Sequence, residues 1–133
     1  MEGTGPFRYV AGQVLTPATA TCLPDALSGD IRAMLRSERI CIVVNERGVV
    51  LGRVRRKDLP AEDDARAEDF MQLGPATVQR REELSGLVER MRSAGVTTII
   101  VTTPKGELLG ILDRGDAERV VAEGVGQGLA QPS

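Results

Sequence analysis

Two short charged segments of this chain carry side chains that could bind a small polar ligand. The first combines several bases with a final acid, in the order Arg53-Val54-Arg55-Arg56-Lys57-Asp58. Guanidinium groups bind phosphate through paired charge-assisted hydrogen bonds, and a carboxylate accepts such bonds from neighbouring hydroxyls. The second segment, Ile111 to Asp116, has Asp113 where the first has Arg55. Because a carboxylate repels phosphate unless a metal ion intervenes, we expect the two segments to bind different groups.

The acids that end these segments also have a structural interpretation. Asp58 and Asp116 lie where a helix is expected to begin. A carboxylate at that position caps backbone N–H groups and interacts favourably with the helix dipole. The basic run is short and the net charge of the chain is −2, so a solvated helix start explains the run better than a nucleic-acid patch does.

Composition argues against several other chemistries. The chain has no histidine, which is the commonest general base and metal ligand, and its two cysteines, Cys22 and Cys41, lack the spacing of a zinc or dithiol motif. Three aromatic residues, Phe7, Tyr9 and Phe70, are too few for base stacking. No nucleophile–base pair, metal cluster or cofactor loop is recognisable, so we expect a protein that is not an enzyme and holds no metal.

Size and charge indicate one soluble globular domain. The chain has 133 residues, of which 41% are hydrophobic and 27% charged. An isoelectric point near 5.2 argues against binding to DNA, RNA or anionic membranes. No apolar run approaches the roughly 20 residues that cross a bilayer, and the N-terminus lacks a signal-peptide pattern. We therefore expect a cytoplasmic protein with no membrane contact.

The charged segments belong to a tandem duplication. Ten identical residues recur in the same order, at a spacing of 57 before Pro104 and of 58 after it. Such a unit seldom buries its apolar face alone, so we expect the two copies to pack together and to form a ligand-binding cleft. The identical pairs are Leu27 and Leu84, Ser28 and Ser85, Gly29 and Gly86, Met34 and Met91, Val44 and Val101, Gly48 and Gly106, Leu51 and Leu109, Gly52 and Gly110, Arg56 and Arg114, and Asp58 and Asp116.

Each copy is expected to fold as a short strand, an amphipathic helix, a β-hairpin and a final helix. Gly29 and Gly86 fall inside the first helix of each copy, where each costs about 1 kcal/mol relative to alanine, and this predicts a close approach between helices. Gly95 is placed to end the helix of the second copy. The expected helices lie near Asp25–Glu38, near Glu82–Ala94, from Arg56 onward and over Arg114–Ala122, and the expected hairpins span residues 40–54 and 97–112.

This doubled order resembles a CBS domain pair, also called a Bateman module. Its motif is Gly-h-h-x-x-x-Asp (h, hydrophobic), at Gly110–Asp116 and, with Arg53 in place of the first hydrophobic residue, at Gly52–Asp58. The resemblance covers about Val14 to Val121. It implies an α+β fold in which two tandem β-α-β-β-α CBS repeats pack with pseudo-twofold symmetry. The expected segments are an N-terminal extension (1–13), CBS repeat 1 (14–60), an acidic linker (61–70), CBS repeat 2 (71–122) and a flexible C-terminal tail (123–133).

The resemblance also implies roles for particular residues. In ligand-binding CBS pairs the final Asp of the motif holds ribose hydroxyls, which here points to Asp58 and Asp116. The Ser or Thr that meets phosphate in the family is replaced by Arg55 and Asp113, with Arg56 beside the former. Contacts to the base would come from apolar residues and backbone, although most of these positions also suit a plain core. They are Thr16, Cys41 and Val54 for one site, and Leu73, Thr98 and Ile111 for the other.

Two functions follow from the resemblance. The first is a stand-alone regulatory module that binds an adenosine-type ligand, of the AMP, ATP or S-adenosylmethionine class, in the cleft between the repeats. It would require no cofactor and would signal through contacts in a homodimer or with an unidentified protein partner. The second is a ligand-free dimerisation or scaffold module, in which Arg55 and Asp113, related by the pseudo-twofold axis, form an ion pair that closes the cleft.

Overall fold

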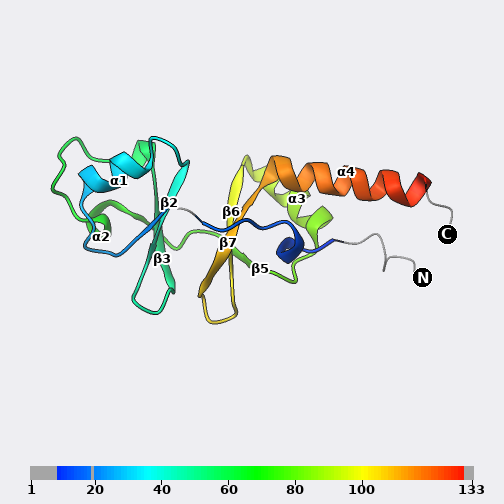
Figure 1. Cartoon of the computed structure of the whole chain (residues 1–133), viewed down its shortest axis with the longest axis horizontal. Coiled ribbons are helices and arrows are strands. Elements are labelled where there is room, and N and C mark those ends of the chain that lie inside the picture. Colours follow the sequence, from blue (N-terminus) through cyan, green and yellow to red (C-terminus); the bar gives the residue numbers. More distant parts are fainter. Residues whose placement is uncertain (1–8, 19, 131–133) are drawn as a thin grey trace. The chain divides into compact units, whose positions relative to one another are not determined.

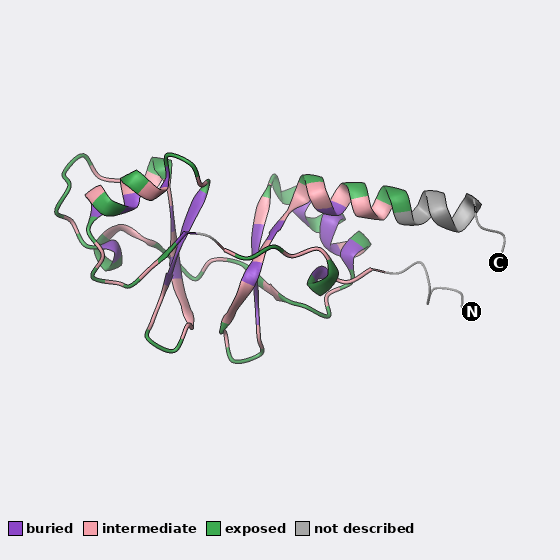
Figure 2. Cartoon of the chain, in the orientation of Figure 1, coloured by how far each residue is buried: buried purple, intermediate pink, exposed green. Residues whose placement is uncertain are grey.

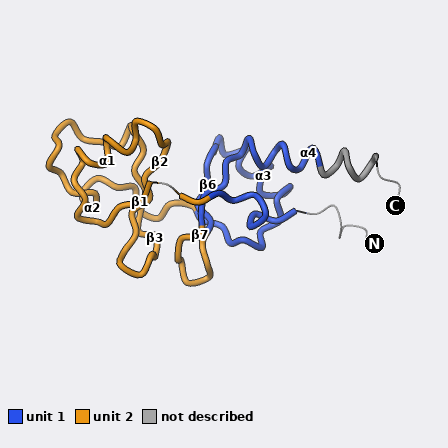
Figure 3. Tube along the Cα trace, in the orientation of Figure 1, with its two compact units in different colours: residues 1–16, 77–101, 110–133 blue, residues 17–76, 102–109 orange. Residues whose placement is uncertain are grey.

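The chain forms two compact units in a computed structural model that describes residues 9–18 and 20–130 (Figure 1). Unit 1 contains the chain up to residue 16, residues 77–101 and the chain from residue 110, whereas unit 2 contains residues 17–76 and 102–109 (Figure 3). Both units combine strands with helices, so the predicted α+β class is confirmed. The compact units are not the contiguous repeats 14–60 and 71–122, because each unit takes segments from both repeats.

Unit 2 is built on a sheet with the strand order β1-β2-β3-β4, in which β1 is parallel to β2 and the other neighbours are antiparallel. The central strand β2 is a continuous apolar run whose first four residues are buried (Figure 2). Cys41 and Val43 of β2 pack with Ile31 and Leu35 in the main core of this unit. Its elements are β1 (Thr21–Cys22), α1 (Ser28–Met34), β2 (Ile40–Val44), β3 (Val50–Arg55), the 3-10 turn η3 (Arg56–Asp58), α2 (Ala67–Phe70) and β4 (Gln72–Leu73).

Unit 1 is built on a three-stranded sheet with the order β5-β6-β7. The apolar face predicted for its first helix is buried, and that helix ends at Gly95, which adopts the left-handed conformation (φ 69°) as predicted. Residues 102–109, at the tip of the β6–β7 hairpin, belong to unit 2, where Glu107 forms a bridge with Val49. The elements are η2 (Ala11–Gln13), β5 (Thr77–Gln79), α3 (Leu84–Ala94), β6 (Thr98–Thr102), β7 (Leu108–Asp113) and α4 (Arg114–Ala130).

Each sheet receives an edge segment from the other sequence repeat. Strand β4 comes just before the helix of the second copy, yet it pairs with β3, where Leu73 lies opposite Gly52. Thr16 comes before the helix of the first copy, yet it bridges Ile111 of β7. The two backbone hydrogen bonds of this bridge are each 2.8 Å long. Strand exchange of this kind places each charged segment beside a stretch of chain that its own repeat does not supply.

These exchanged segments explain why glycine recurs at positions 52 and 110. A Cβ atom on Gly52 would lie 2.7 Å from Sδ of Met71 and 2.9 Å from the carbonyl oxygen of Gln72. A Cβ atom on Gly110 would lie 2.4 Å from the carbonyl oxygen of Thr16. Both approaches are shorter than real Cβ contacts, so any side chain at these positions would displace the exchanged segment.

The final helix predicted from Arg56 is only the 3-10 turn η3. Leu59 is already extended (φ −71°, ψ 131°) because it precedes Pro60, and a residue before proline is disfavoured in the helical region. The first helix is correspondingly short, Ser28–Met34 rather than Asp25–Glu38.

Three further segments differ in detail from the sequence prediction. Residues 61–70, expected to be a linker, contain α2. Residues 123–130, expected to be a flexible tail, continue α4, while residues 131–133 lie outside the described residues. In the expected N-terminal extension, residues 1–8 also lie outside the described residues, and Val10 bridges Glu83 in unit 1.

The close helix approach predicted at both internal glycines is not found. A Cβ atom on Gly29 would lie 3.0 Å from Cβ of Asp63, which belongs to the loop after η3 rather than to a helix. A Cβ atom on Gly86 would meet only the side chains of Glu83 and Arg90, at 3.5 Å or more. The prediction is therefore wrong for Gly86 as far as the described residues extend, and at Gly29 the close neighbour is a loop.

Candidate ligand site

The basic segment forms a cluster at the end of β3 in unit 2. Arg53 and Arg55 are two residues apart on this strand, so their side chains project from the same face of the sheet. Nε of Arg53 donates a hydrogen bond of 2.9 Å to Oε1 of Gln72, a residue of the exchanged strand β4. Arg55 lies opposite Ile40, the first residue of β2. The sheet thus places two guanidinium groups together at one strand end.

Asp58 faces this pair from the turn that follows β3. Its Oδ2 accepts a hydrogen bond of 2.8 Å from the backbone N–H of Arg55 and one of 3.3 Å from Nε of Arg55. The side chains of Arg55 and Asp58 remain 31% and 19% exposed. The capping role weighed from the sequence is therefore present at Asp58. Among the described residues both hydrogen bonds of this carboxylate use Oδ2, which leaves Oδ1 for a further donor.

The environment of Arg53 disfavours its charged form, which lowers the pKa of this arginine. Burial lowers the pKa of Arg53, the nearby charge of Arg55 lowers it further, and the carboxylate of Asp58 partly offsets these effects. Two guanidinium groups and one carboxylate leave the cluster with a net positive charge. An anion bound here would be attracted by both guanidinium groups, as phosphate is in other arginine sites.

Arg56, which the sequence placed in the same site, has a structural contact. Its Nε donates a hydrogen bond of 2.7 Å to the carbonyl oxygen of Leu35, the residue that follows α1. Its counterpart in the second copy, Arg114, donates one of 3.2 Å to the carbonyl oxygen of Val96, just beyond the end of α3. The duplicated arginine therefore stabilises the C-terminal end of the preceding helix in both copies, where unpaired carbonyl groups accept cationic donors.

In unit 1 the capping carboxylate is Asp113, whereas in unit 2 it is Asp58, the equivalent of Asp116. Oδ2 of Asp113 accepts a hydrogen bond of 3.2 Å from the backbone N–H of Asp116 at the start of α4. Oδ1 of Asp116 accepts one of 3.1 Å from Arg119. In the first copy Asp58 accepts from the backbone N–H three residues earlier, whereas in the second copy Asp113 accepts from the backbone N–H three residues later. The position equivalent to Arg55 is thus a helix-capping carboxylate, and this segment has no arginine pair on its strand.

The residues predicted to contact a base divide differently between the two units. Cys41 and Val54 are fully buried in unit 2, which fits the core interpretation. Leu73 is 71% exposed and pairs with β3 instead of lying with Thr98 and Ile111. In exchange, Thr16 lies against Ile111 in unit 1, and both Ile111 and Thr98 are half-buried. The strand exchange therefore places Thr16 in unit 1 and Leu73 in unit 2, the reverse of the predicted sets.

Two residues of the cluster were not assigned to the site by sequence reasoning. Arg53 belongs to the basic run but not to the predicted site residues, and Gln72 lies on β4, a two-residue strand that is too short for a sequence pattern to reveal. The recurring glycines at 52 and 110 were the available signal, because a glycine inside a strand often marks the close approach of another backbone.

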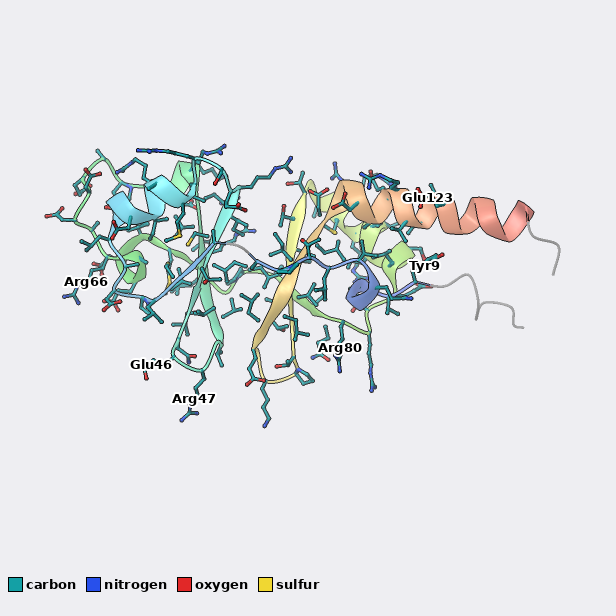
Figure 4. All side chains as sticks on the ribbon, viewed as in Figure 1. Tyr9, Glu46, Arg47, Arg66, Arg80 and Glu123 are labelled. Carbon is teal, nitrogen blue, oxygen red and sulfur yellow. The ribbon has the colours of Figure 1, made fainter. Side chains whose placement is uncertain are left out.

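A separate cavity of about 430 Å³ opens on unit 2 beside the turn between β2 and β3. Glu46 and Arg47 extend from this turn away from the sheet (Figure 4). None of the predicted site residues lines the cavity, whose walls are formed by Leu23, Pro24, Asp25, Asn45, Glu46, Arg47 and Glu68.

The part of the chain that the structure describes contains neither a cluster of metal-binding acids and thiols nor a helix that could cross a membrane. No group of three or more cysteine, aspartate or glutamate side chains is arranged to hold a metal ion there. No helix in that part combines the length and apolar character that crossing a membrane requires.

Fold and site together define a class of protein: a tandem α+β module whose repeats carry polar clusters where a hairpin strand ends. Residues 67–123 match the family model of the CBS domain. No curated protein matched the chain. The match identifies a CBS domain in residues 67–123, and the solved structures described next show that the chain has the fold of a CBS domain pair.

Three solved structures illustrate the likeness in fold. CBSX2 in complex with AMP superposes with a TM-score of 0.77 at 21% identity, covering 86% of this chain and 97% of that chain. The CBS domain pair of MJ0100, in complex with 5-methylthioadenosine and S-adenosyl-L-methionine, gives 0.73 at 16% identity, covering 87% and 98%. The cytosolic domain of the Mg2+ channel MgtE, in complex with ATP, gives 0.77 at 22% identity, with 84% of this chain covering 48% of that chain.

Proposed function

We propose that this chain is a regulatory module that binds an adenosine-type ligand, and that the cluster of Arg53, Arg55 and Asp58 in unit 2 receives the phosphate and ribose of that ligand. The observation that carries the proposal is this net positive, partly exposed cluster in a chain whose overall charge is −2. Three structures with the same fold are complexes with AMP, with ATP, or with 5-methylthioadenosine and S-adenosyl-L-methionine, which supports this class of ligand.

The geometry assigns a separate task to each side chain. Asp58 holds Nε of Arg55, so the guanidinium plane is oriented while its terminal nitrogens remain for a phosphate oxygen. Gln72 orients Arg53 in the same way through Nε. Oδ1 of Asp58 is left to accept a hydrogen bond from a ribose hydroxyl. Orientation before binding reduces the entropy lost when the ligand is bound.

The equivalent segment of unit 1 should select a different ligand or none. Asp113 and Asp116 are acids, and Asp113 already caps α4. Phosphate would be repelled there, whereas an uncharged adenosine compound or the sulfonium cation of S-adenosylmethionine would not. The two copies are therefore expected to differ in ligand, with the phosphorylated compound bound at the arginine pair.

Thermal unfolding with a ligand panel tests the proposal. AMP, ATP, S-adenosylmethionine and adenosine are compared at equal concentration with the full chain. A ligand at a hundred times its dissociation constant stabilises the folded state by about 2.7 kcal/mol, which for a domain of this size raises the melting temperature by about 5 to 15 °C. No shift with any compound would refute ligand binding and favour the scaffold function.

A charge-matched pair of variants tests the position of the site. Arg55→Ala removes one charge-assisted hydrogen bond, worth about 1.5 to 3 kcal/mol, so AMP and ATP should bind about 10 to 100 times more weakly. Adenosine should bind as to the parent. Arg47→Ala makes the same charge change at the β2–β3 turn, where Arg47 points away from the sheet (Figure 4), and should alter neither ligand. Equal effects of the two variants would show that only net charge matters.

The second candidate function is a ligand-free scaffold closed by an ion pair between Arg55 and Asp113. The capping roles of Asp58 and Asp113 favour it, since both carboxylates already serve the protein itself. The pair itself stays a prediction. A double-mutant cycle of Arg55→Ala and Asp113→Ala measures it: a coupling of about 0.5 kcal/mol or more in unfolding free energy supports the pair, and additive effects exclude it.

The proposal includes three further statements. The chain acts as a homodimer or through a protein partner. For a homodimer, light scattering should give twice the monomer mass at micromolar concentration. It has no catalytic activity of its own, so ATP should remain intact after prolonged incubation with the protein. It functions in the cytoplasm, where its free cysteines would remain reduced.

A further inference from the structure

The cavity beside the β2–β3 turn of unit 2 is separate from the arginine cluster, and the proposed function does not use it. Its volume of about 430 Å³ lies in the range of about 300 to 1,000 Å³ in which proteins bind small molecules. Three segments form its walls: residues 23–25 before α1, residues 45–47 in the β2–β3 turn, and Glu68 of α2. All three belong to unit 2, so this unit forms the cavity by itself.

Hydrogen bonds to the backbone hold the walls of the cavity in place. Oδ1 of Asn45 accepts one of 2.9 Å from the backbone N–H of Arg47 and one of 3.0 Å from that of Val49, which fixes the β2–β3 turn. The backbone N–H of Glu68 donates one of 2.9 Å to the carbonyl oxygen of Pro24, which joins α2 to the segment before α1. The cavity is therefore preformed, and a ligand that enters it loses little affinity to the ordering of loops.

The charges that line this cavity are mostly negative. Asp25, Glu46 and Glu68 contribute three carboxylates and Arg47 contributes one guanidinium, which leaves the lining with a net charge of −2. Oε2 of Glu68 lies 3.5 Å from a guanidinium nitrogen of Arg66. Among the described residues, the carboxylates of Asp25 and Glu46 have neither an ion pair nor a hydrogen bond. Two of the three acids are thus left for a cation from outside the chain.

The second copy of the duplication neutralises the corresponding acid within the protein. At a spacing of 57 residues, Asp25 corresponds to Glu82 and Ala33 corresponds to Arg90. A guanidinium nitrogen of Arg90 lies 2.6 Å from Oε2 of Glu82. The alanine at position 33 cannot form such a pair. The unpaired carboxylate on the cavity wall is therefore a feature of the first copy alone.

We propose that this cavity binds a small aliphatic polyamine, a cation with two or more ammonium groups joined by alkyl chains. Each ammonium group donates charge-assisted hydrogen bonds to a carboxylate, and the alkyl chain packs against Leu23, an apolar residue of the wall that is 46% exposed. The three carboxylates come from three segments and, over the described part of the chain, are not arranged to hold one metal ion. Charges separated along a chain fit this arrangement better than a single ion does.

Titration of the full chain with spermidine, followed by backbone amide shifts in NMR spectra at low ionic strength, tests the proposal. Saturable shifts at Asn45, Arg47 and Glu68, with one spermidine per chain, are expected. Butylamine has one charge and should bind about threefold more weakly or less tightly still, because exposed ion pairs each contribute modestly. Shifts that do not saturate, shifts spread over every acidic segment, or equal binding of butylamine overturn the proposal. No adenosine ligand is present, so the result is independent of the proposed function.

Neutral substitutions then locate the polyamine. Asp25→Asn and Glu46→Gln each remove one carboxylate from the wall and should weaken spermidine binding about threefold or more. Asp64→Asn makes the same charge change at an exposed residue of unit 2 that does not line the cavity, and should leave the affinity unchanged. Parental affinity in either cavity variant, or equal weakening by Asp64→Asn, would show that spermidine does not bind in this cavity.

Discussion

The exchanged segment at Gly110 gives the sharpest test of the fold. Gly110→Ala adds a single methyl group where a Cβ atom would lie 2.4 Å from the carbonyl oxygen of Thr16 and 2.7 Å from Cδ1 of Leu15. The carbonyl oxygen belongs to the backbone and cannot move alone. The segment that contains Thr16 must therefore shift away from β7, and the bridge to Ile111 must lengthen or break.

The cost follows from the interactions that the shift affects. The two hydrogen bonds between Thr16 and Ile111, each 2.8 Å long, contribute about 0.5 to 1.5 kcal/mol each. Overpacking adds about 1 to 3 kcal/mol, and the lower entropy of the unfolded alanine chain returns about 0.4 to 1 kcal/mol. The free energy of unfolding should fall by about 3 kcal/mol, which lowers the melting temperature by about 10 °C.

Thermal unfolding followed by circular dichroism measures this change, and Gly86→Ala is the matched control. A Cβ atom on Gly86 meets only side chains at 3.5 Å or more, so alanine should stabilise α3 by up to about 1 kcal/mol. The same substitution thus has opposite signs at the two glycines. If Gly110→Ala melts at or above the parental temperature, or leaves the amide exchange of Ile111 unchanged, the exchanged segment is not where the structure places it.

Three further predictions concern single contacts. Asp113→Ala removes the carboxylate that caps α4 and should lower the free energy of unfolding by about 1 kcal/mol, measured by urea denaturation, whereas Asp113→Asn should retain most of the parental value. Arg114→Leu removes the donor to the carbonyl of Val96 and should cost about 1 kcal/mol in the same assay; an unchanged midpoint would mean that this contact does not stabilise α3. Iodoacetamide should alkylate Cys22 well before Cys41, since the pKa of Cys22 is lowered and the pKa of Cys41 is raised, and the midpoint of the Cys22 rate should lie below pH 9.0, the ordinary value for a thiol. Peptide mass mapping across pH would contradict this order if both cysteines reacted at equal rates.

Sequence reasoning succeeded where local pattern determines structure. The hairpin strands around Ile40–Val44 and Thr98–Thr102 are short apolar β-branched runs beside glycine turns, and they appear close to the predicted bounds. Helix α3 buries the predicted apolar face and ends at Gly95. The shortened helix after Arg56 could also have been predicted, because Pro60 was visible in the sequence and restricts the preceding residue.

The candidate site was predicted only in part, because its geometry depends on chain segments far apart in sequence. The arginine cluster includes Gln72, which arrives on a two-residue strand with no hydrophobic pattern of its own. Thr16 was predicted to lie with Cys41 and Val54 but pairs with Ile111, and Leu73 was predicted to lie with Thr98 and Ile111 but pairs with Gly52. Both differences arise because these segments pair with strands far away in the sequence. Which acid caps which turn was equally undetermined, since Asp58 reaches back to Arg55 while Asp113 reaches forward to Asp116.

The sequence by itself determined the duplication, the α+β class and the charge difference between Arg55 and Asp113, because these follow from residue identity, spacing and local periodicity. Only the tertiary structure decided that each sheet takes an edge segment from the other repeat. Edge strands of two residues are held by hydrogen bonds to distant backbone and by the absence of a side chain at Gly52 and Gly110. Those are interactions between residues far apart in the chain, which no local pattern encodes.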